Sequence, residues 1–106
     1  MEARKAYNAK DYDKAMRYYQ SAQNKNIDGI DLNEEMGQTA YKKRDFEKAE
    51  QIYQEANSKL SNEKQQARNH YNTGNSRMKS KNYQGAVDSY KDALRINPDD
   101  KEARYN

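Results

Sequence analysis

Residue types able to do acid–base or metal chemistry are scarce in this chain. His70 is the only histidine and there is no cysteine, so disulfides and thiolate metal sites are excluded. A Ser/His/Asp triad would need partners beside His70, and the helical pattern described below places them on other faces. Glu34, Glu35 and Glu50 are expected to be ordinary helix carboxylates. We therefore predict that the chain is not an enzyme.

Two short stretches have the composition of ligand loops without their spacing. "DGID" (28–31) lacks the ligand positions of a calcium loop. "TGNS" (73–76) has one glycine and no following Lys-Ser/Thr pair, and it falls inside a helical pattern. The sequence predicts no metal and no cofactor.

Basic and aromatic side chains suggest nucleic-acid binding as an alternative, since they could contact phosphates and stack on bases. The relevant basic residues are Arg68, Arg77, Lys79 and Lys81. However, Tyr83 and Tyr90 are expected to be committed to packing. The net charge of +3 comes from 20 basic and 17 acidic residues that alternate along the chain, which is typical of a solvated surface. Nucleic acid is not the expected partner.

Three stretches of the chain share one pattern of residues. This pattern predicts the helices on which any functional site must lie. The stretches are "YNAKDYDKAMRYYQSA" (7–22), "YKKRDFEKAEQIYQEA" (41–56) and "MKSKNYQGAVDSYKDA" (78–93). Ala49 follows Ala15 by 34 residues, and Ala86 follows Ala49 by 37. Small and aromatic residues recurring at such a period indicate a stacked helical repeat.

Each copy predicts a helix, a short turn and a second helix. An Asp or Asn stands where a helix N-cap belongs, because its side chain can accept hydrogen bonds from the first turn. An Ala, a Tyr and an Ala then follow at i, i+4 and i+7, which is one stripe of a helix. The caps are Asp11, Asp45 and Asn82, and the stripes are Ala15, Tyr19 and Ala22; Ala49, Tyr53 and Ala56; and Ala86, Tyr90 and Ala93.

Glycines mark the first helix of two units. Gly37 and Gly74 each lie twelve residues before the alanine that begins a stripe, and Ala3 has the same place in the first unit. Since glycine costs a helix interior about 1 kcal/mol, it needs a packing reason such as a close helix contact. Pro98 is expected to stop the final helix. We predict helices at 2–9, 12–24, 31–43, 46–60, 63–80 and 83–96, with a last partial turn from Asp99.

Composition allows only a thin core. Hydrophobic residues make up 33% of the chain and charged residues 35%, which is close to the composition of disordered proteins. A solenoid relaxes this demand because each repeat has to cover only its neighbours. There is no apolar run of the ~20 residues that a membrane span requires, so no membrane insertion by this segment is expected. No apolar signal-peptide segment follows Met1.

The pattern resembles the tetratricopeptide repeat, W-x2-L-G-x2-Y followed by A-x3-F and P, over essentially the whole chain. The resemblance implies an all-α fold, a right-handed α-solenoid of about three helix-turn-helix units. The single array 1–106 would comprise a clipped first unit (1–29), a second with extra residues in its turn (30–66), a third (67–100) and the start of a truncated fourth (101–106).

Departures from the family pattern are concentrated in the third unit. Thr73 replaces the leucine before the glycine, Arg77 replaces the following aromatic residue, and His70 stands where the family often has tryptophan. Ala40 makes the corresponding change from an aromatic residue in the second unit. We expect weaker packing of the first helix of the third unit. The three extra residues, in 58–66, are expected to lengthen the flanking helices.

The resemblance implies a protein–protein interaction scaffold that binds a peptide or protein segment in a concave groove lined by the first helices. Transferred by position, the groove residues are Arg4, Tyr7, Asp31, Glu34, Gln38, Tyr41, Arg68, Tyr71, Asn75 and Met78, joined by Asn72 as a hydrogen-bonding group. The family's carboxylate clamp is not matched, because Glu35 and Asn72 replace its Asn and Arg. Since Asp31, Glu34 and Glu35 would make the middle of the groove acidic, a basic or neutral segment is the expected ligand. Self-association through uncapped ends, and a non-binding structural fragment or designed array, are the alternatives that stay open.

A narrower resemblance concerns the stretch "YNTGNSRMKSKNYQGAVDSYKDALRINPDDKEARYN" (71–106) and the opening "EARKAYNAKDYDKA". Both are similar to the repeat region of the Bat aerotolerance-operon proteins of bacteria, where a "YNLGN…NPND…RYNL" run is typical. This resemblance implies the periplasmic side of a bacterial cell envelope and a membrane-anchored parent protein. Without it, a cytoplasmic location is expected.

Overall fold

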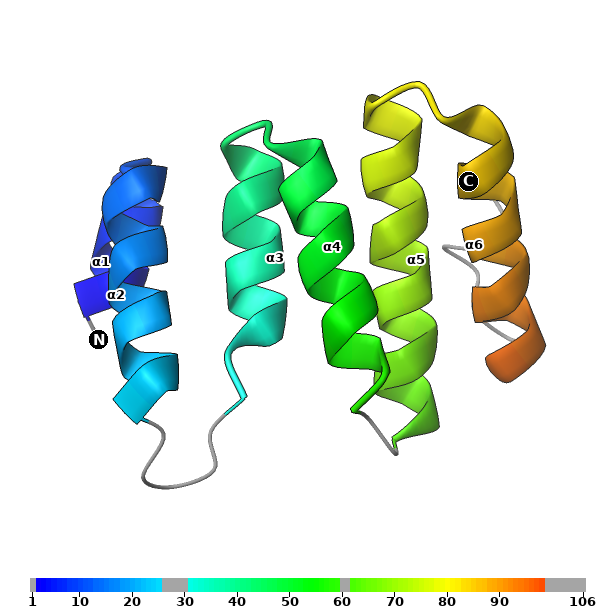
Figure 1. Cartoon of the computed structure of the whole chain (residues 1–106), viewed down its shortest axis with the longest axis horizontal. Helices are drawn as coiled ribbons and strands as arrows, with labels where there is room; N and C mark the ends of the chain where they lie inside the picture. The colour runs from blue at the N-terminus through cyan, green and yellow to red at the C-terminus, as the bar shows by residue number, and fades with distance from the viewer. Residues whose placement is uncertain (1, 26–30, 60–61, 99–106) are drawn as a thin grey trace.

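The computed structural model describes residues 2–25, 31–59 and 62–98, and this part of the chain is entirely helical, without strands. Its helices succeed one another across the molecule in chain order (Figure 1). The all-α repeat fold is therefore confirmed, whereas the right-handed sense of its superhelix stays a prediction. The helices are α1 (Glu2–Asn8), α2 (Tyr12–Lys25), α3 (Asn33–Lys42), α4 (Phe46–Asn57), α5 (Glu63–Lys79) and α6 (Tyr83–Ile96).

The largest departures from the predicted helix bounds lie around the turn that holds the extra residues. Helix α4 ends at Asn57 rather than at 60, while α5 has 17 residues against 10 in α3. The Asn62 side chain accepts a hydrogen bond from the Gln65 N–H and caps α5, which begins at the predicted residue 63. The expected lengthening thus occurs in α5 alone. The predicted turn from Asp99 and the fourth unit (101–106) lie outside the described residues.

The turn within each helical hairpin has the same geometry in all three units. The predicted cap side chains accept from the backbone N–H three residues later, at 3.3 Å for Asp11, 3.4 Å for Asp45 and 3.1 Å for Asn82. Their own N–H groups donate to the carbonyl five residues back, at 2.8–2.9 Å. This bond satisfies the free carbonyls at the end of the first helix.

Closing that turn requires a left-handed residue just before each cap. Lys10, Arg44 and Lys81 have φ values of 64°, 72° and 68°. Glycine is the usual residue there, because a Cβ destabilises the left-handed conformation. The sequence pattern did not predict this feature, since none of the three positions carries glycine.

The predicted stripes form the core. Ala15, Ala49 and Ala86 are fully buried, and the tyrosine one turn further on is buried in every unit. A Cβ added at Gly37 would lie 2.5 Å from the Tyr53 ring, and one added at Gly74 would lie 2.5 Å from the Tyr90 ring. The packing reason expected for the two glycines is thus confirmed: an aromatic ring of the second helix lies directly on the backbone of the first.

Arg77 does not leave the third unit poorly packed, contrary to the expectation from the missing aromatic residue. Its Nε donates to Glu50 at 2.7 Å, and its Nη1 donates to the Gly85 carbonyl at 3.0 Å and to Ser89 Oγ at 2.7 Å. Both partners of the ion pair are largely buried. One guanidinium therefore joins α4, α5 and α6, which no local pattern in the sequence indicated.

A membrane span would need a longer and more apolar helix than any of those in the described ranges.

Candidate functional site

A hollow of about 290 Å³ lies across the first helices of the three units. Five of the residues predicted to line the groove border it: Tyr7, Gln38, Tyr41, Asn72 and Asn75. They come from α1, α3 and α5, so the structure brings together residues from all three units. Lys42 and Tyr53 also border the hollow, although the groove positions taken from the family pattern did not include them. Tyr53 was assigned to the core alone, and Lys42 is not at a transferred position.

Tyr53 and Tyr90 occupy equivalent places in successive units but differ at their hydroxyl groups. The Tyr90 hydroxyl donates to Asn75 Oδ1 at 2.6 Å. Among the described residues, no hydrogen bond joins the Tyr53 hydroxyl to a protein group, although the Tyr53 side chain is only 2% exposed and borders the hollow. Burial raises the pKa of Tyr90 to about 12, so this hydroxyl stays protonated as a donor.

The groove tyrosines also stabilise the hairpins. The Tyr41 ring meets the Phe46 ring edge-on with centroids 5.3 Å apart, and Tyr7 meets Tyr12 in the same way at 5.6 Å. Tyr71 lies 5.8 Å from the Tyr90 ring. Tyr41 and Tyr71 are not on the buried stripes, but their rings also take part in the packing. Tyr7 and Tyr41 border the hollow as well, whereas Tyr71 does not.

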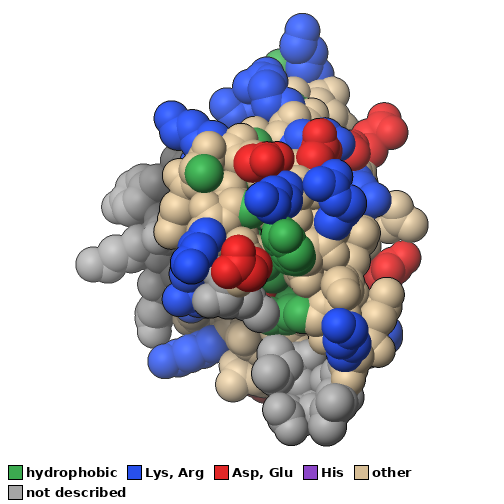
Figure 2. Space-filling view, turned by 90° about the vertical axis from the view of Figure 1, so that its left-hand side faces the viewer, with side chains coloured by type: hydrophobic (Ala, Val, Ile, Leu, Met, Phe, Trp, Pro, Cys, Tyr) green, Lys and Arg blue, Asp and Glu red, His purple; other side chains and the backbone are tan. Residues whose placement is uncertain are grey.

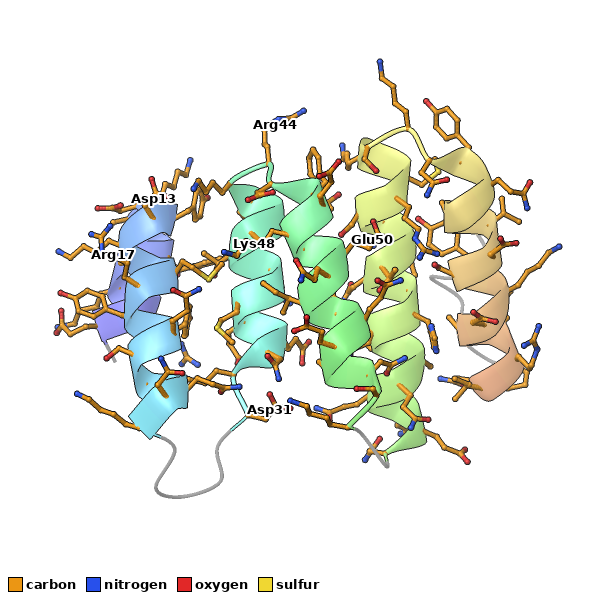
Figure 3. All side chains as sticks on the ribbon, viewed as in Figure 1. Asp13, Arg17, Asp31, Arg44, Lys48 and Glu50 are labelled. Atoms are coloured by element: carbon orange, nitrogen blue, oxygen red, sulfur yellow. The ribbon has the colours of Figure 1, made fainter. Side chains whose placement is uncertain are left out.

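The predicted acidic residues border a different hollow of about 100 Å³ with Asn33, Gln65 and Asn69. Asp31 precedes α3 instead of lying within it, and its carboxylate accepts from the Asn33 N–H at 2.9 Å. Figure 3 shows Asp31 at the opposite end of α3 from Arg44. Glu34 pairs with Arg68 at 3.3 Å, so two of the predicted groove residues bind each other.

Glu35 is not the ordinary carboxylate that the sequence suggested. Burial, opposed in part by a backbone hydrogen bond, raises its pKa, and the charges of Glu34 and Asp31 add to the effect. Its Oε2 is buried without a hydrogen-bond partner among the described residues. The carboxylate therefore destabilises the fold whenever it is charged.

The remaining predicted residues lie away from the central hollow. Arg4 and Met78 are exposed, and neither borders the hollows described above. Tyr83, expected to be buried, is 56% exposed. His70 is half-buried: the Asn57 amide donates to its Nε2 at 2.8 Å, and burial lowers the pKa of its imidazole. Its environment is that of a helix-packing residue.

A second hollow of about 190 Å³ lies between α2, the end of α3 and the start of α4. It is bordered by Arg17 and Lys48, which Figure 3 labels on the second helices, and by the ion pair of Asp13 with Lys43. Its charges are mixed, and no buried polar group points to a ligand. Within the described ranges, no group of three His, Cys, Asp or Glu side chains is arranged to hold a metal ion.

The two ends of the array differ in their surfaces. On the side of α1 and α2, Figure 2 shows a narrow strip of hydrophobic side chains among basic and acidic ones. On α6, Val87 is exposed in addition to Tyr83. Val87 occupies the place that Glu50 has in the preceding unit, where the carboxylate binds Arg77.

Comparison with known proteins supports the repeat assignment. Residues 67–100, which include α5 and α6, match the tetratricopeptide repeat family model. No curated protein matches the chain. The match supports a tetratricopeptide repeat protein, in agreement with the shared geometry of the three units.

Proposed function

We propose that this chain is a protein-interaction scaffold that binds an extended protein or peptide segment along its first helices. The observation that carries the proposal is the 290 Å³ hollow, bordered by residues of all three units. Tetratricopeptide repeats are commonly protein–protein interaction modules, which agrees with this proposal.

The groups around the hollow suit a polypeptide ligand. The amides of Gln38, Asn72 and Asn75 can donate and accept, as the backbone of an extended segment requires. Tyr7 and Tyr41 add aromatic surface with a polar tip, which buries much area at little cost in side-chain entropy. Such a lining can hold a segment without demanding one sequence throughout.

The nucleic-acid alternative lacks a comparable surface. Arg68 and Arg77 are paired with Glu34 and Glu50, so two of the four cations proposed for it are already neutralised. Self-association through α6, where Tyr83 and Val87 are exposed, stays an alternative. A measurement of the molecular mass in solution tests it. The narrower resemblance to the Bat proteins, with an envelope location, also remains a proposal and rests on residues 71–106 and the opening stretch.

Selection from a random peptide library, followed by affinity measurements on the selected peptides, tests the proposal. Replacing Gln38 and Asn72 together by leucine should weaken binding at least ~10-fold, because the ligand loses partners for its buried polar groups. A matched control replaces Gln20 and Gln54, which are exposed on the second helices, by leucine and should change affinity less than ~2-fold. If only the control pair weakens binding, the ligand lies on the second helices and the groove proposal is wrong.

A further inference from the structure

We propose that the Tyr53 hydroxyl and the Lys42 ammonium form a subsite for the side-chain carboxylate of an acidic residue in the bound segment. This inference rests on the proposed function and specifies the chemistry of the ligand at one position. It changes the expectation of a basic or neutral segment, which was based on Asp31, Glu34 and Glu35.

The repeat provides its own comparison for Tyr53. Tyr90 and Asn75 lie 37 residues after Tyr53 and Gln38, so each pair occupies the same two places in its unit. In the later unit the hydroxyl donates to the asparagine at 2.6 Å. In the earlier unit, no described residue forms a hydrogen bond with the Tyr53 hydroxyl, and the Gln38 side chain is exposed. The Tyr53 ring is buried, but its hydroxyl is not among the buried unpaired polar atoms of the described residues, so this hydroxyl is accessible from the hollow and suited to donate to a ligand.

Lys42 supplies the charge at the same hollow. Its side chain is exposed and makes no ion pair within the described part of the chain. No carboxylate borders the hollow. Glu34 is eight residues before Lys42, which is about 12 Å along a helix, and it is paired with Arg68. Lys42 is therefore available to an anion brought by a ligand.

The Tyr53 hydroxyl is protonated and can therefore donate to a ligand as well as accept from one. Burial, with a contribution from Glu34, raises the pKa of Tyr53 well above its ordinary value. The hydroxyl is thus neutral near pH 7 and donates to an acceptor. Both Tyr53 and Lys42 border the hollow, so a carboxylate bound there can accept from the hydroxyl and pair with the ammonium, and hydrogen bonds to a charged group are the stronger kind.

Two other anions fit less well. A phosphate group carries nearly two negative charges at neutral pH, and Lys42 is the one cation among the residues that border the hollow. A C-terminal carboxylate would end the ligand here. The hollow instead extends from Tyr7 in the first unit to Asn75 in the third, which leaves room for a segment to continue beyond the carboxylate. A side-chain carboxylate within the segment agrees with both observations.

The test uses random peptides displayed with their C-termini fused to the carrier, so that acidic side chains supply the carboxylates. Asp or Glu should be enriched at one position. A selected peptide should then bind at least ~10-fold more tightly than its copy with Asn or Gln at that position, the scale of a charge-assisted hydrogen bond. Tyr53→Phe and Lys42→Gln should each reduce this preference to less than ~3-fold. Lys25→Gln, which changes an exposed lysine on α2, should leave it unchanged.

Stability measurements separate binding from folding. Tyr53→Phe should keep the urea midpoint of the wild type, because its hydroxyl has no partner in the described structure, whereas Tyr90→Phe should lower it through the loss of the bond to Asn75. Selected peptides without an acidic preference, or with a preference that survives both substitutions, would overturn the inference while the proposed function stands. A preference lost when free peptides are amidated at the C-terminus would assign the carboxylate to the terminus and overturn the side-chain assignment. Failure to select any peptide would overturn both proposals.

Discussion

Gly37 lies under the ring of Tyr53, and replacing it by alanine should destabilise the protein. In an ordinary helix interior the same change stabilises by about 1 kcal/mol, because alanine is the better helix former. Here the added Cβ would lie 2.5 Å, 2.6 Å and 3.0 Å from the Cε1, Cζ and Cδ1 atoms of Tyr53. The ring is 2% exposed, so it cannot move into solvent without opening the contact between α3 and α4.

The expected magnitude follows from these two opposing effects. Forcing extra methyl groups into a packed core costs about 1–3 kcal/mol, and the contact with three ring atoms places Gly37→Ala at the upper end of that range. After subtraction of the gain in helix propensity, the net destabilisation should be about 1–2 kcal/mol. For a chain of this size, that lowers the melting temperature by roughly 4–16 °C.

Urea unfolding followed by far-UV circular dichroism measures the effect, with Gln38→Gly as the control for propensity alone. Gln38 is exposed next to Gly37 on α3, so its replacement should cost about 1 kcal/mol, as glycine does in any exposed helix interior. Combining Gly37→Ala with Tyr53→Leu should destabilise less than the sum of the two single changes, because the clash disappears with the ring. If Gly37→Ala raises the urea midpoint, the ring does not rest on this glycine and the packing described for the repeats is wrong.

Three further predictions concern polar and strained positions. Glu50→Gln should destabilise the fold by about 1–3 kcal/mol in urea melts, because the largely buried Arg77 loses its charged partner; an unchanged midpoint would show that Gly85 and Ser89 suffice. Glu35→Gln should raise stability at neutral pH: a raised pKa in the folded state means that stability falls as pH increases through that pKa. The advantage of the variant should vanish below the ordinary pKa of glutamate, and a gap that is constant with pH would contradict this account. Arg44→Gly should stabilise by up to ~1 kcal/mol, since φ is 72° there; a loss in thermal melts would mean that the Arg44 contact with the Phe46 ring outweighs the backbone strain.

The sequence by itself determined the helices, their caps and the buried stripe. Asp45 and Asn82 cap helices through bonds to residues three positions later, and such bonds depend only on local backbone geometry. Ala49 and Tyr53 are one helical turn apart, so their shared face follows from the period of the helix. The repeat then fixed which helices are neighbours, because each unit must cover the next.

The tertiary structure alone decided which polar groups are paired. Arg77 and Glu50 are 27 residues apart, and nothing near either residue in the sequence indicates their contact. Tyr53 and Tyr90 obey one pattern, yet only Tyr90 has a hydrogen-bonding partner in the described structure. The physical reason is that hydrogen bonds require atoms within about 3.5 Å, and such distances between helices depend on the side chains packed around them. The stripe shows where the tyrosines are buried, whereas the absence of a partner for the Tyr53 hydroxyl among the described residues, despite Gln38 at the place of Asn75, follows only from the tertiary structure.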